Sequence, residues 1–166
     1  MSEVVIELAC LDDAEILYNL INDVYLIENG NTGEQFKTGT RYHSIDSIIA
    51  PLNTKNVYKA VLNNIIVGVI VWEIEENNEK SLFFGPLGVS KTHQGLGIGT
   101  KLMKFIEELA KEKNKTQLNM CVVNHRTSLI KSYEKIGFIA TGVTEPYYEP
   151  QYLTRDSTFL FFSKPL

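Results

Sequence analysis

The sequence predicts an α/β fold with one mixed sheet, in which about seven mostly antiparallel strands carry helices on both faces. Short β-branched apolar runs alternate with segments of helical periodicity, and three strand-like runs follow one another in the middle of the chain. No linker interrupts the 166 residues, a length typical of one compact core. We therefore expect a single domain over residues 1–166.

The N-terminal segment predicts a strand followed by a helix. The run Val4–Cys10 is short, apolar and β-branched, and Asp12 with Glu15 has the spacing of a capping box at a helix start. An apolar stripe at helical spacing follows, made of Leu17, Leu20, Ile21 and Val24. We expect this helix to end near Asn29-Gly30.

The next segment predicts a loop, a short helix and the start of a meander. Residues 29–43 are rich in Gly, Asn and Thr and lack periodicity, which is typical of a loop, and residues 44–50 predict a short helix. The strand-like runs 57–62 and 65–75 flank Asn63-Asn64, where both asparagines tolerate the positive φ of a hairpin turn.

The second half predicts alternating strands and helices. A third meander strand leads into a glycine cluster and a helix with apolar residues at positions 98, 102, 105, 106 and 109. The remaining expected elements are strands at 82–89, 117–123, 138–143 and 158–163, and a helix at 128–136 closed by Gly137.

Composition disfavours several classes of partner. Sixteen basic and 20 acidic residues give a net charge of −4, which provides no field for nucleic acid or an anionic membrane surface. The longest apolar run, Ile65–Trp72, is far shorter than a membrane helix requires. The N-terminus shows no secretory signal, so we expect a cytoplasmic protein without membrane or nucleic acid partners.

The cysteines and histidines predict no metal site. Cys10 and Cys121 lie in apolar, strand-like surroundings, where small buried thiols are commoner than disulfides or metal ligands. His93 and His125 do not combine with them at ligand spacing.

Glycine at positions 95, 97 and 99, directly before a predicted helix, is the strongest local signal. Glycine lets the backbone approach a ligand closely, and the free N–H groups of a helix start favour phosphate. A glycine turn that only packs a strand on a helix is the structural alternative. A Walker loop is absent, and a dinucleotide fingerprint would need glycine where Thr100 stands.

The segment Gln94-Gly95-Leu96-Gly97-Ile98-Gly99 fits the Q/R-x-x-G-x-G/A signature of the GNAT superfamily of N-acetyltransferases. Leu87-Gly88-Val89 resembles the central strand of that family, and Asn124 with residues 132–138 resembles its second conserved region. The order of strands and helices agrees from Val4 to Phe162. The resemblance implies a GNAT-like fold with acetyl-coenzyme A (acetyl-CoA) as cosubstrate.

The resemblance also implies where the cofactor binds. The amides of Leu87 and Val89 would meet the pantetheine arm, and Asn124 would touch it from the facing strand. Gly85-Pro86 supplies a physical cause for an opening there, because proline removes a ladder donor and glycine permits a bulge. An edge irregularity without a ligand is the alternative. The implied cofactor-binding residues are Leu87, Gly88, Val89, Gln94, Gly95, Leu96, Gly97, Ile98, Gly99, Thr100 and Asn124.

Acetyl transfer to an amine requires an oxyanion stabiliser, a proton donor for the thiolate and a neutral nucleophile. We expect the Leu87 amide to polarise the thioester carbonyl, and Tyr133, where the family often places its acid, to protonate the sulfur. Tyr133 also lies on the apolar face of its helix, so core packing is the alternative. The strand 82–89 contains no carboxylate, so deprotonation through water is expected. Weaker candidates for the base are Glu73, Glu34, His43 and His125.

The predicted function is transfer of acetyl from acetyl-CoA to a primary amine of a small molecule, peptide or protein, by direct attack in a ternary complex. Tyr147-Tyr148 and Tyr152 are candidates for an aromatic wall of the acceptor pocket, although packing of a long loop explains them equally well. Two alternatives remain open. One is a catalytically inactive acyl-CoA sensor, and the other is a nucleotide-binding protein with a coincidental glycine turn.

Overall fold

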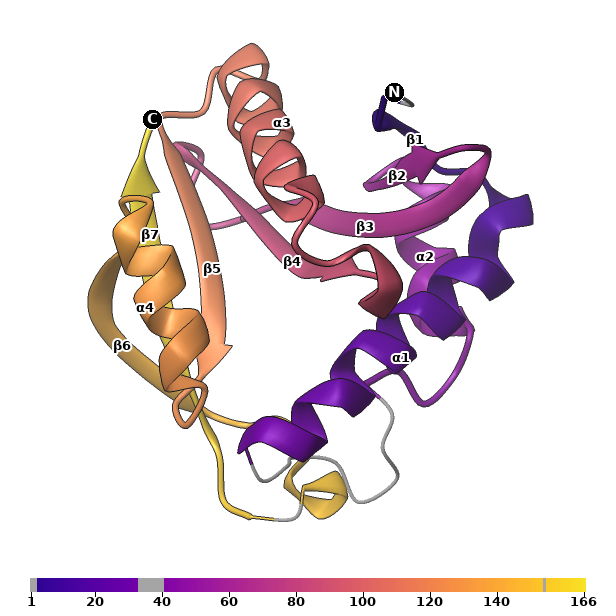
Figure 1. Ribbon diagram of the computed structural model, residues 1–166. Helices are drawn as coiled ribbons and strands as arrows, with labels where there is room; N and C mark the ends of the chain where they lie inside the picture. Colours follow the sequence, from indigo (N-terminus) through magenta and orange to yellow (C-terminus); the bar gives the residue numbers. More distant parts are fainter. Residues whose placement is uncertain (1–2, 33–40, 154) are drawn as a thin grey trace.

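A computed structural model describes residues 3–32, 41–153 and 155–166 and confirms the mixed α/β architecture. Seven strands form one sheet in the order β1-β2-β3-β4-β5-β7-β6 (Figure 1). The strands are β1 (Val5–Leu8), β2 (Val57–Leu62), β3 (Ile65–Ile74), β4 (Ser81–Val89), β5 (Gln117–Val123), β6 (Ile139–Pro146) and β7 (Thr158–Pro165). The α-helices are α1 (Ala14–Thr32), α2 (Asp46–Asn53), α3 (Ile98–Glu112) and α4 (Thr127–Lys135). Short 3-10 turns cover Leu11–Asp13, Lys91–His93 and Pro150–Tyr152.

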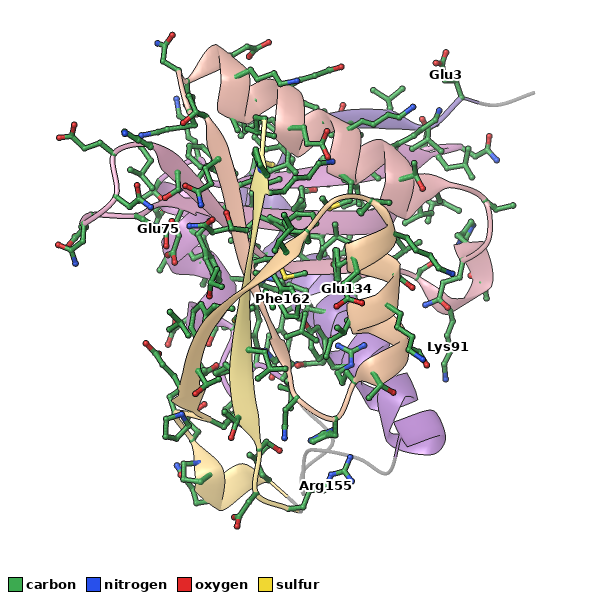
Figure 2. The ribbon with its side chains drawn as sticks, turned by 90° about the vertical axis from the view of Figure 1, so that its left-hand side faces the viewer. Glu3, Glu75, Lys91, Glu134, Arg155 and Phe162 are labelled. Atoms are coloured by element: carbon green, nitrogen blue, oxygen red, sulfur yellow. The ribbon has the colours of Figure 1, made fainter. Side chains whose placement is uncertain are left out.

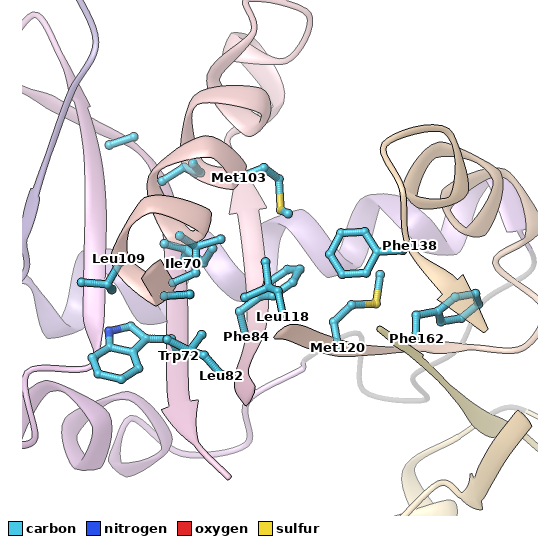
Figure 3. Close-up of a cluster of buried hydrophobic side chains, with 14 of the residues drawn as sticks. Ile70, Trp72, Leu82, Phe84, Met103, Leu109, Leu118, Met120, Phe138 and Phe162 are labelled. Atoms are coloured by element: carbon cyan, nitrogen blue, oxygen red, sulfur yellow. The ribbon is translucent and has the colours of Figure 1, made fainter. Parts of the chain in front are cut away.

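Helices cover both faces of the sheet, as the sequence predicts. One apolar cluster joins α3 to the central strands and includes Phe84, Met120 and Phe138 (Figure 3). Side chains of α4 pack against this cluster. A second cluster joins α1 and α2 to the opposite face of β2 and β3 and includes Leu17 and Ile48. Figure 2, viewed from the side of β6 and β7, shows α4 beside these two strands.

The central feature of the sheet is the separation of β4 from β5. Among the strands of the described residues, this is the one parallel neighbour pair, and it is in register only from Ser81 to Phe83, opposite Gln117–Asn119. Beyond that point the two strands diverge (Figure 1). The sheet therefore has an opening in its middle, bounded by the second half of β4 and the C-terminal half of β5.

The expected irregularity at Gly85-Pro86 is present. Trp72 on β3 pairs with Phe84, whereas Ile70 pairs with Leu87, so two residues of β4 face one residue of β3. This two-to-one pairing is a β-bulge, which bends a strand and re-aims its amides. The bulge lies where pairing with β5 ends.

Two boundaries differ from the sequence predictions. Helix α1 continues to Thr32 rather than ending near Asn29-Gly30, because one glycine inside a helix costs only about 1 kcal/mol. The capping box is formed by Cys10 and Asp13, at the 3-10 turn before α1, instead of by Asp12 and Glu15. The side-chain atom Oδ2 of Asp13 accepts a hydrogen bond from the Cys10 amide at 2.9 Å. The predicted loop 29–43 lies partly outside the described residues.

The prediction that both cysteines are buried is wrong for Cys10. This residue follows the exposed edge strand β1 and is itself exposed, whereas Cys121 on β5 is half-buried. Both thiols are free. Among the helices of the described ranges, none has the length and apolar character needed to cross a membrane.

Asp13 ties the start of α1 to the edge of the sheet. Its carboxylate accepts hydrogen bonds from Lys59 Nζ at 2.8 and 2.9 Å, and Lys59 lies on β2. Burial acts to raise the pKa of Asp13, but the hydrogen bonds from Lys59 and Cys10 outweigh it and hold that pKa below its ordinary value.

We expect Asp13→Asn to lower the free energy of unfolding by about 2 kcal/mol at pH 7, the size of a hydrogen bond to a charged group. A lowered folded-state pKa stabilises the protein above the unfolded value of about 3.9, and this contribution is lost as the pH falls through the folded value. Denaturant unfolding from pH 7 to pH 3 measures the difference, which should shrink on acidification. Asp12→Asn is the matched control, because Asp12 is exposed. A constant difference across this range would contradict the account.

Candidate functional site

The glycine loop connects the end of β4 to the start of α3. Gly95 and Gly97 have φ of 81° and 76°, values that residues with a side chain rarely adopt. A Cβ atom added at either glycine would meet no neighbouring atom within 4 Å. Gln94 fixes the loop to the strand, because its Nε2 donates to the carbonyl oxygen of Val89 at 3.2 Å. These glycines are required by backbone conformation, and both face open space.

The loop delivers the first turn of α3 to a cavity of about 510 Å³. Gly97 is the N-cap, and its carbonyl accepts the first helical hydrogen bond, from Lys101 N at 3.0 Å. The amides before Lys101 therefore have no intrahelical acceptor, and they carry the positive end of the helix dipole. The cavity is lined by Val24, Leu87, Gly88, Val89, His93, Gln94, Gly95, Gly97, Ile98, Gly99 and Thr100.

All the predicted cofactor-binding residues except Leu96 and Asn124 line this cavity. Leu96 lies within the loop with its side chain 61% exposed. Asn124 turns toward β7, where its Oδ1 accepts from the Thr158 amide at 3.2 Å. A role for the Asn124 side chain stays a prediction.

The free amides of β4 point into the opening of the sheet. The amide of Ser90, just after β4, donates to the carbonyl oxygen of Val67 on β3 at 2.8 Å. Because amides alternate in direction along a strand, the amide of Gly88 also points toward β3. The intervening amides, those of Leu87 and Val89, therefore point away from β3. Since β5 has already separated, this edge of β4 offers them no strand partner.

A second cavity, of about 470 Å³, continues between α3 and α4. It shares Leu87, Gly99 and Thr100 with the first cavity, so the two adjoin at these residues. Its other walls come from both helices and β7, and include Met103, Lys104, Leu129, Ser132, Tyr133 and Lys164. Met103, Lys104, Leu129 and Lys164 carry no sequence signal for a site, because they are ordinary helix and strand positions that only the tertiary fold brings together.

Tyr133 both packs in the core and borders the opening. Its ring lies 5.5 Å from that of Phe138 in an edge-to-face arrangement and 6.4 Å from that of Phe84, measured between centroids. Tyr133 also lines the second cavity and a smaller cavity of about 140 Å³, and Leu87 is a wall of both. The position of Tyr133 is thus compatible both with core packing and with a role as proton donor.

Two small cavities adjoin the second cavity on the side away from the glycine loop. The 140 Å³ cavity shares Leu87, Leu129 and Tyr133 with the second cavity. It shares a larger set with a fourth cavity of about 110 Å³, namely Tyr25, Phe84, Gly85, Pro86, Cys121 and Arg126. The fourth cavity lies beside Tyr25 of α1 and is also lined by Arg41 and Tyr147. Four cavities therefore lead in series from the glycine loop to the side of α1.

Burial keeps two ionisable groups of the inner cavities, Cys121 and Tyr147, in their neutral forms. Burial raises the pKa of Cys121 to about 11 despite the opposing effect of Arg41, so this thiol stays protonated at pH 7. Tyr147 is 4% exposed, and its ring stacks on Tyr148 at 4.8 Å. It lines the fourth cavity as the predicted aromatic wall would, whereas the side chain of Tyr152 lies outside the described residues.

The three candidate bases within the described residues, Glu73, His43 and His125, line none of the four cavities. His43 Nε2 lies 3.7 Å from Glu149, and His125 Nε2 lies 2.9 Å from Ser157 Oγ. Burial, followed by the charges of Arg155 and Arg126, lowers the pKa of His125. Burial, followed by Glu75, raises the pKa of Glu73 on β3. Glu34 lies outside the described residues.

Comparison with known families gives a match over most of the chain. Residues 26–149 match the family model described as the acetyltransferase (GNAT) domain. This range includes the separated strands, the glycine loop, α3 and α4. A search of the curated proteins finds no match.

Solved structures share the whole fold at low sequence identity. The putative acetyltransferase yncA from Salmonella typhimurium, solved with its cofactor acetyl-CoA, aligns with a TM-score of 0.75 and 17% identity, over 99% of this chain and 95% of that chain. The ribosomal-protein-alanine N-acetyltransferase from Brucella melitensis aligns with a TM-score of 0.75 and 22% identity, over 98% and 99% of the two chains. A GNAT acetyltransferase from Elizabethkingia anophelis with acetyl-CoA bound aligns with a TM-score of 0.66 and 20% identity, over 98% of each chain.

The family model covers well over half of the chain, and the similar structures have the same fold from end to end. The glycine segment 94–99 that fits the family signature forms the loop before α3, next to the separated strands. The chain belongs to the GNAT family of acetyltransferases.

Proposed function

We propose that this protein is an N-acetyltransferase that moves acetyl from acetyl-CoA to a primary amine by direct attack in a ternary complex. The observation that carries the proposal is the series of adjoining cavities from the glycine loop, past Leu87 and Tyr133, to Tyr25 on α1. Two substrates entering from opposite sides would meet beside Leu87. The free cysteines are compatible with a reducing, cytoplasmic location.

The glycine loop fits a diphosphate. The amides of the first turn of α3 and of Gly95 and Gly97 border the 510 Å³ cavity, where main-chain donors and the helix dipole favour an anion. A ligand backed by β4 on one side and α3 on the other would be held without needing a buried basic side chain. The hydrogen bond from the Gln94 side chain to the Val89 carbonyl holds this loop against the end of β4.

The edge of β4 fits the pantetheine arm. The amides of Leu87 and Val89 point into the opening, so an extended chain containing amides can pair with them as an added strand would. The 470 Å³ cavity between α3 and α4 continues the same path and gives the arm apolar walls. This fit is independent of the glycine loop, because it follows from the separation of the strands.

When bound, acetyl-CoA supplies an activated thioester. We assign the Leu87 amide to the carbonyl oxygen, where it would stabilise developing negative charge. We assign the Tyr133 hydroxyl to the sulfur, where it would supply the proton that the thiolate needs. The neutral Cys121 thiol favours direct attack by the amine over a covalent relay through this cysteine. Since no Asp or Glu lies on the second half of β4, a water molecule would take the proton of the amine.

The first test is release of free thiol from acetyl-CoA with a panel of small amines and peptides, together with calorimetry of CoA binding. The proposal predicts binding and amine-dependent release. Binding without release to any amine would indicate the acyl-CoA sensor instead. Absence of CoA binding by folded protein would contradict both.

Gly97→Ala should weaken CoA binding about tenfold or more, because an L residue with φ near 76° is strained by about 1–2 kcal/mol and relaxation moves the donor amides. Calorimetry of CoA binding measures this effect. Gly142→Ala is a matched control, since Gly142 has φ of 82° and equally open space but lies on β6. Equal loss of affinity in both variants would count against the loop as the diphosphate site.

Tyr133→Phe should lower kcat by roughly 100-fold, the usual contribution of a general acid, and change the Kd for CoA by less than about threefold. The ring that packs on Phe138 and Phe84 is retained, so the thermal midpoint should stay close to that of the wild type. Tyr58→Phe removes a hydroxyl from a tyrosine that packs on Phe105, away from the cavities, and should leave kcat unchanged. A Tyr133→Phe variant with wild-type kcat would remove Tyr133 from the mechanism.

A further inference from the structure

Two of the three arginines of the chain line the fourth cavity, which is the one farthest along the series from the glycine loop. Arg41 and Arg126 both line the 110 Å³ cavity, and Arg126 also lines the 140 Å³ cavity next to Leu87 and Tyr133. The other walls of the smaller cavity are mainly apolar or aromatic, including Tyr25, Phe83, Val123, Tyr147 and Phe159. An arginine side chain is charged at any physiological pH. The acceptor side of the path is thus a small, cationic, largely apolar chamber.

Arg41 is held in place from both ends. The backbone amides of Arg41 and Tyr42 donate to Oδ1 of the buried Asn22 on α1, at 2.9 and 2.8 Å. The Nδ2 group of Asn22 donates to the carbonyl oxygen of Tyr42 at 3.2 Å. At the far end, the guanidinium donates to the hydroxyl of Tyr148 at 2.6 Å. The side chain is therefore built into the chamber by α1 and by the segment before β7.

The surroundings of Arg41 stabilise its charge without neutralising it. Its guanidinium carbon lies 5.8, 5.6 and 5.8 Å from the ring centroids of Tyr25, Tyr42 and Tyr148, within range of cation–π attraction. Burial raises the pKa of Tyr42 to about 12, so this phenol carries no charge at pH 7. Among the described residues, no Asp or Glu forms an ion pair with Arg41. A partly buried guanidinium with five N–H donors is suited to receive a carboxylate.

We propose that the acceptor is a small primary amine that carries a carboxylate, as a free amino acid does, with the carboxylate bound by Arg41 and the amine directed toward Leu87 and Tyr133. This inference rests on the proposed acetyl transfer. The two adjoining cavities provide one compartment for each end of such a molecule. Polyamines and aminoglycosides, which carry several positive charges, would be repelled by the two arginines.

The same charges assist the chemistry. An amine must lose its proton before it attacks a thioester, and nearby cations favour the neutral form. Arg126 borders the compartment where the amine would react, whereas the substrate carboxylate would offset the charge of Arg41 in the neighbouring compartment. A carboxylated acceptor would therefore bind as an ion pair at one end and react as a neutral nucleophile at the other.

The test compares each amino acid with the amine that lacks its carboxylate. The pairs are L-alanine and ethylamine, L-leucine and isopentylamine, and L-phenylalanine and phenethylamine, with the methyl esters as a third set. Thiol release from acetyl-CoA gives kcat/KM for each compound. We expect at least one amino acid to exceed both its amine and its ester by about tenfold or more, the effect of a charge-assisted hydrogen bond.

Arg41→Gln should abolish this preference through a higher KM, with kcat and the Kd for CoA nearly unchanged. Glutamine retains a donor for Tyr148, so the chamber should stay folded, and the thermal midpoint checks this. Arg155→Gln is the matched control, because Arg155 lines none of the four cavities. An unaltered preference in Arg41→Gln would overturn the assignment of Arg41.

The outcomes separate this inference from the proposed function. Transfer to ethylamine, phenethylamine or spermidine in preference to the amino acids would overturn the inference and leave acetyl transfer intact. If no compound releases thiol although CoA binds, the proposed transferase activity fails. Calorimetry of L-phenylalanine and phenethylamine into the CoA complex then tests the chamber by itself. Equal or undetectable binding of both would overturn the inference.

Discussion

The separation of β4 from β5 after Phe83 is the constraint on which the rest of the structure depends. A sheet ordinarily satisfies the amides of a central strand on both sides, but β4 loses its neighbour halfway along its length. The bulge at Gly85-Pro86 coincides with this point and sets the direction of the residues that follow. As a result, a buried strand presents the amides of Leu87 and Val89 to an opening instead of to another strand.

The two apolar clusters keep this opening in shape. The cluster under α3 anchors the β4 side through Phe84 and the β5 side through Met120, and Phe138 packs between them and Tyr133 (Figure 3). The cluster under α1 and α2 supports the opposite face of the sheet. The helix start that favours an anion and the strand edge that favours an amide chain are therefore parts of one rigid frame. The cavity lined by Arg41 and Arg126 is the third part, and Tyr25 of α1 forms one of its walls.

The sequence predicted the parts of the site that depend on local backbone chemistry. Gly95 and Gly97 need positive φ, and Gly85-Pro86 disturbs a ladder, so residue type alone indicated the loop and the bulge. Periodicity likewise predicted the order of strands and helices. The capping residue was misassigned because Asp12 and Asp13 are adjacent and equally suitable by type, and only the contacts of Asp13 with the Cys10 amide and Lys59 distinguish them. The chamber was not predictable, since Arg41 and Arg126 are distant in sequence and follow no periodic pattern.

Hydrogen exchange measured amide by amide, with and without CoA, tests the central claim most directly. The account predicts that CoA slows exchange at two separate groups of amides, those of Leu87 and Val89 on β4 and those from Gly95 to Thr100 at the start of α3. Amides of the β6–β7 hairpin should exchange at the same rate in both states. Saturation of the protein with CoA without protection at either group would contradict the account, because the ligand would then be held elsewhere.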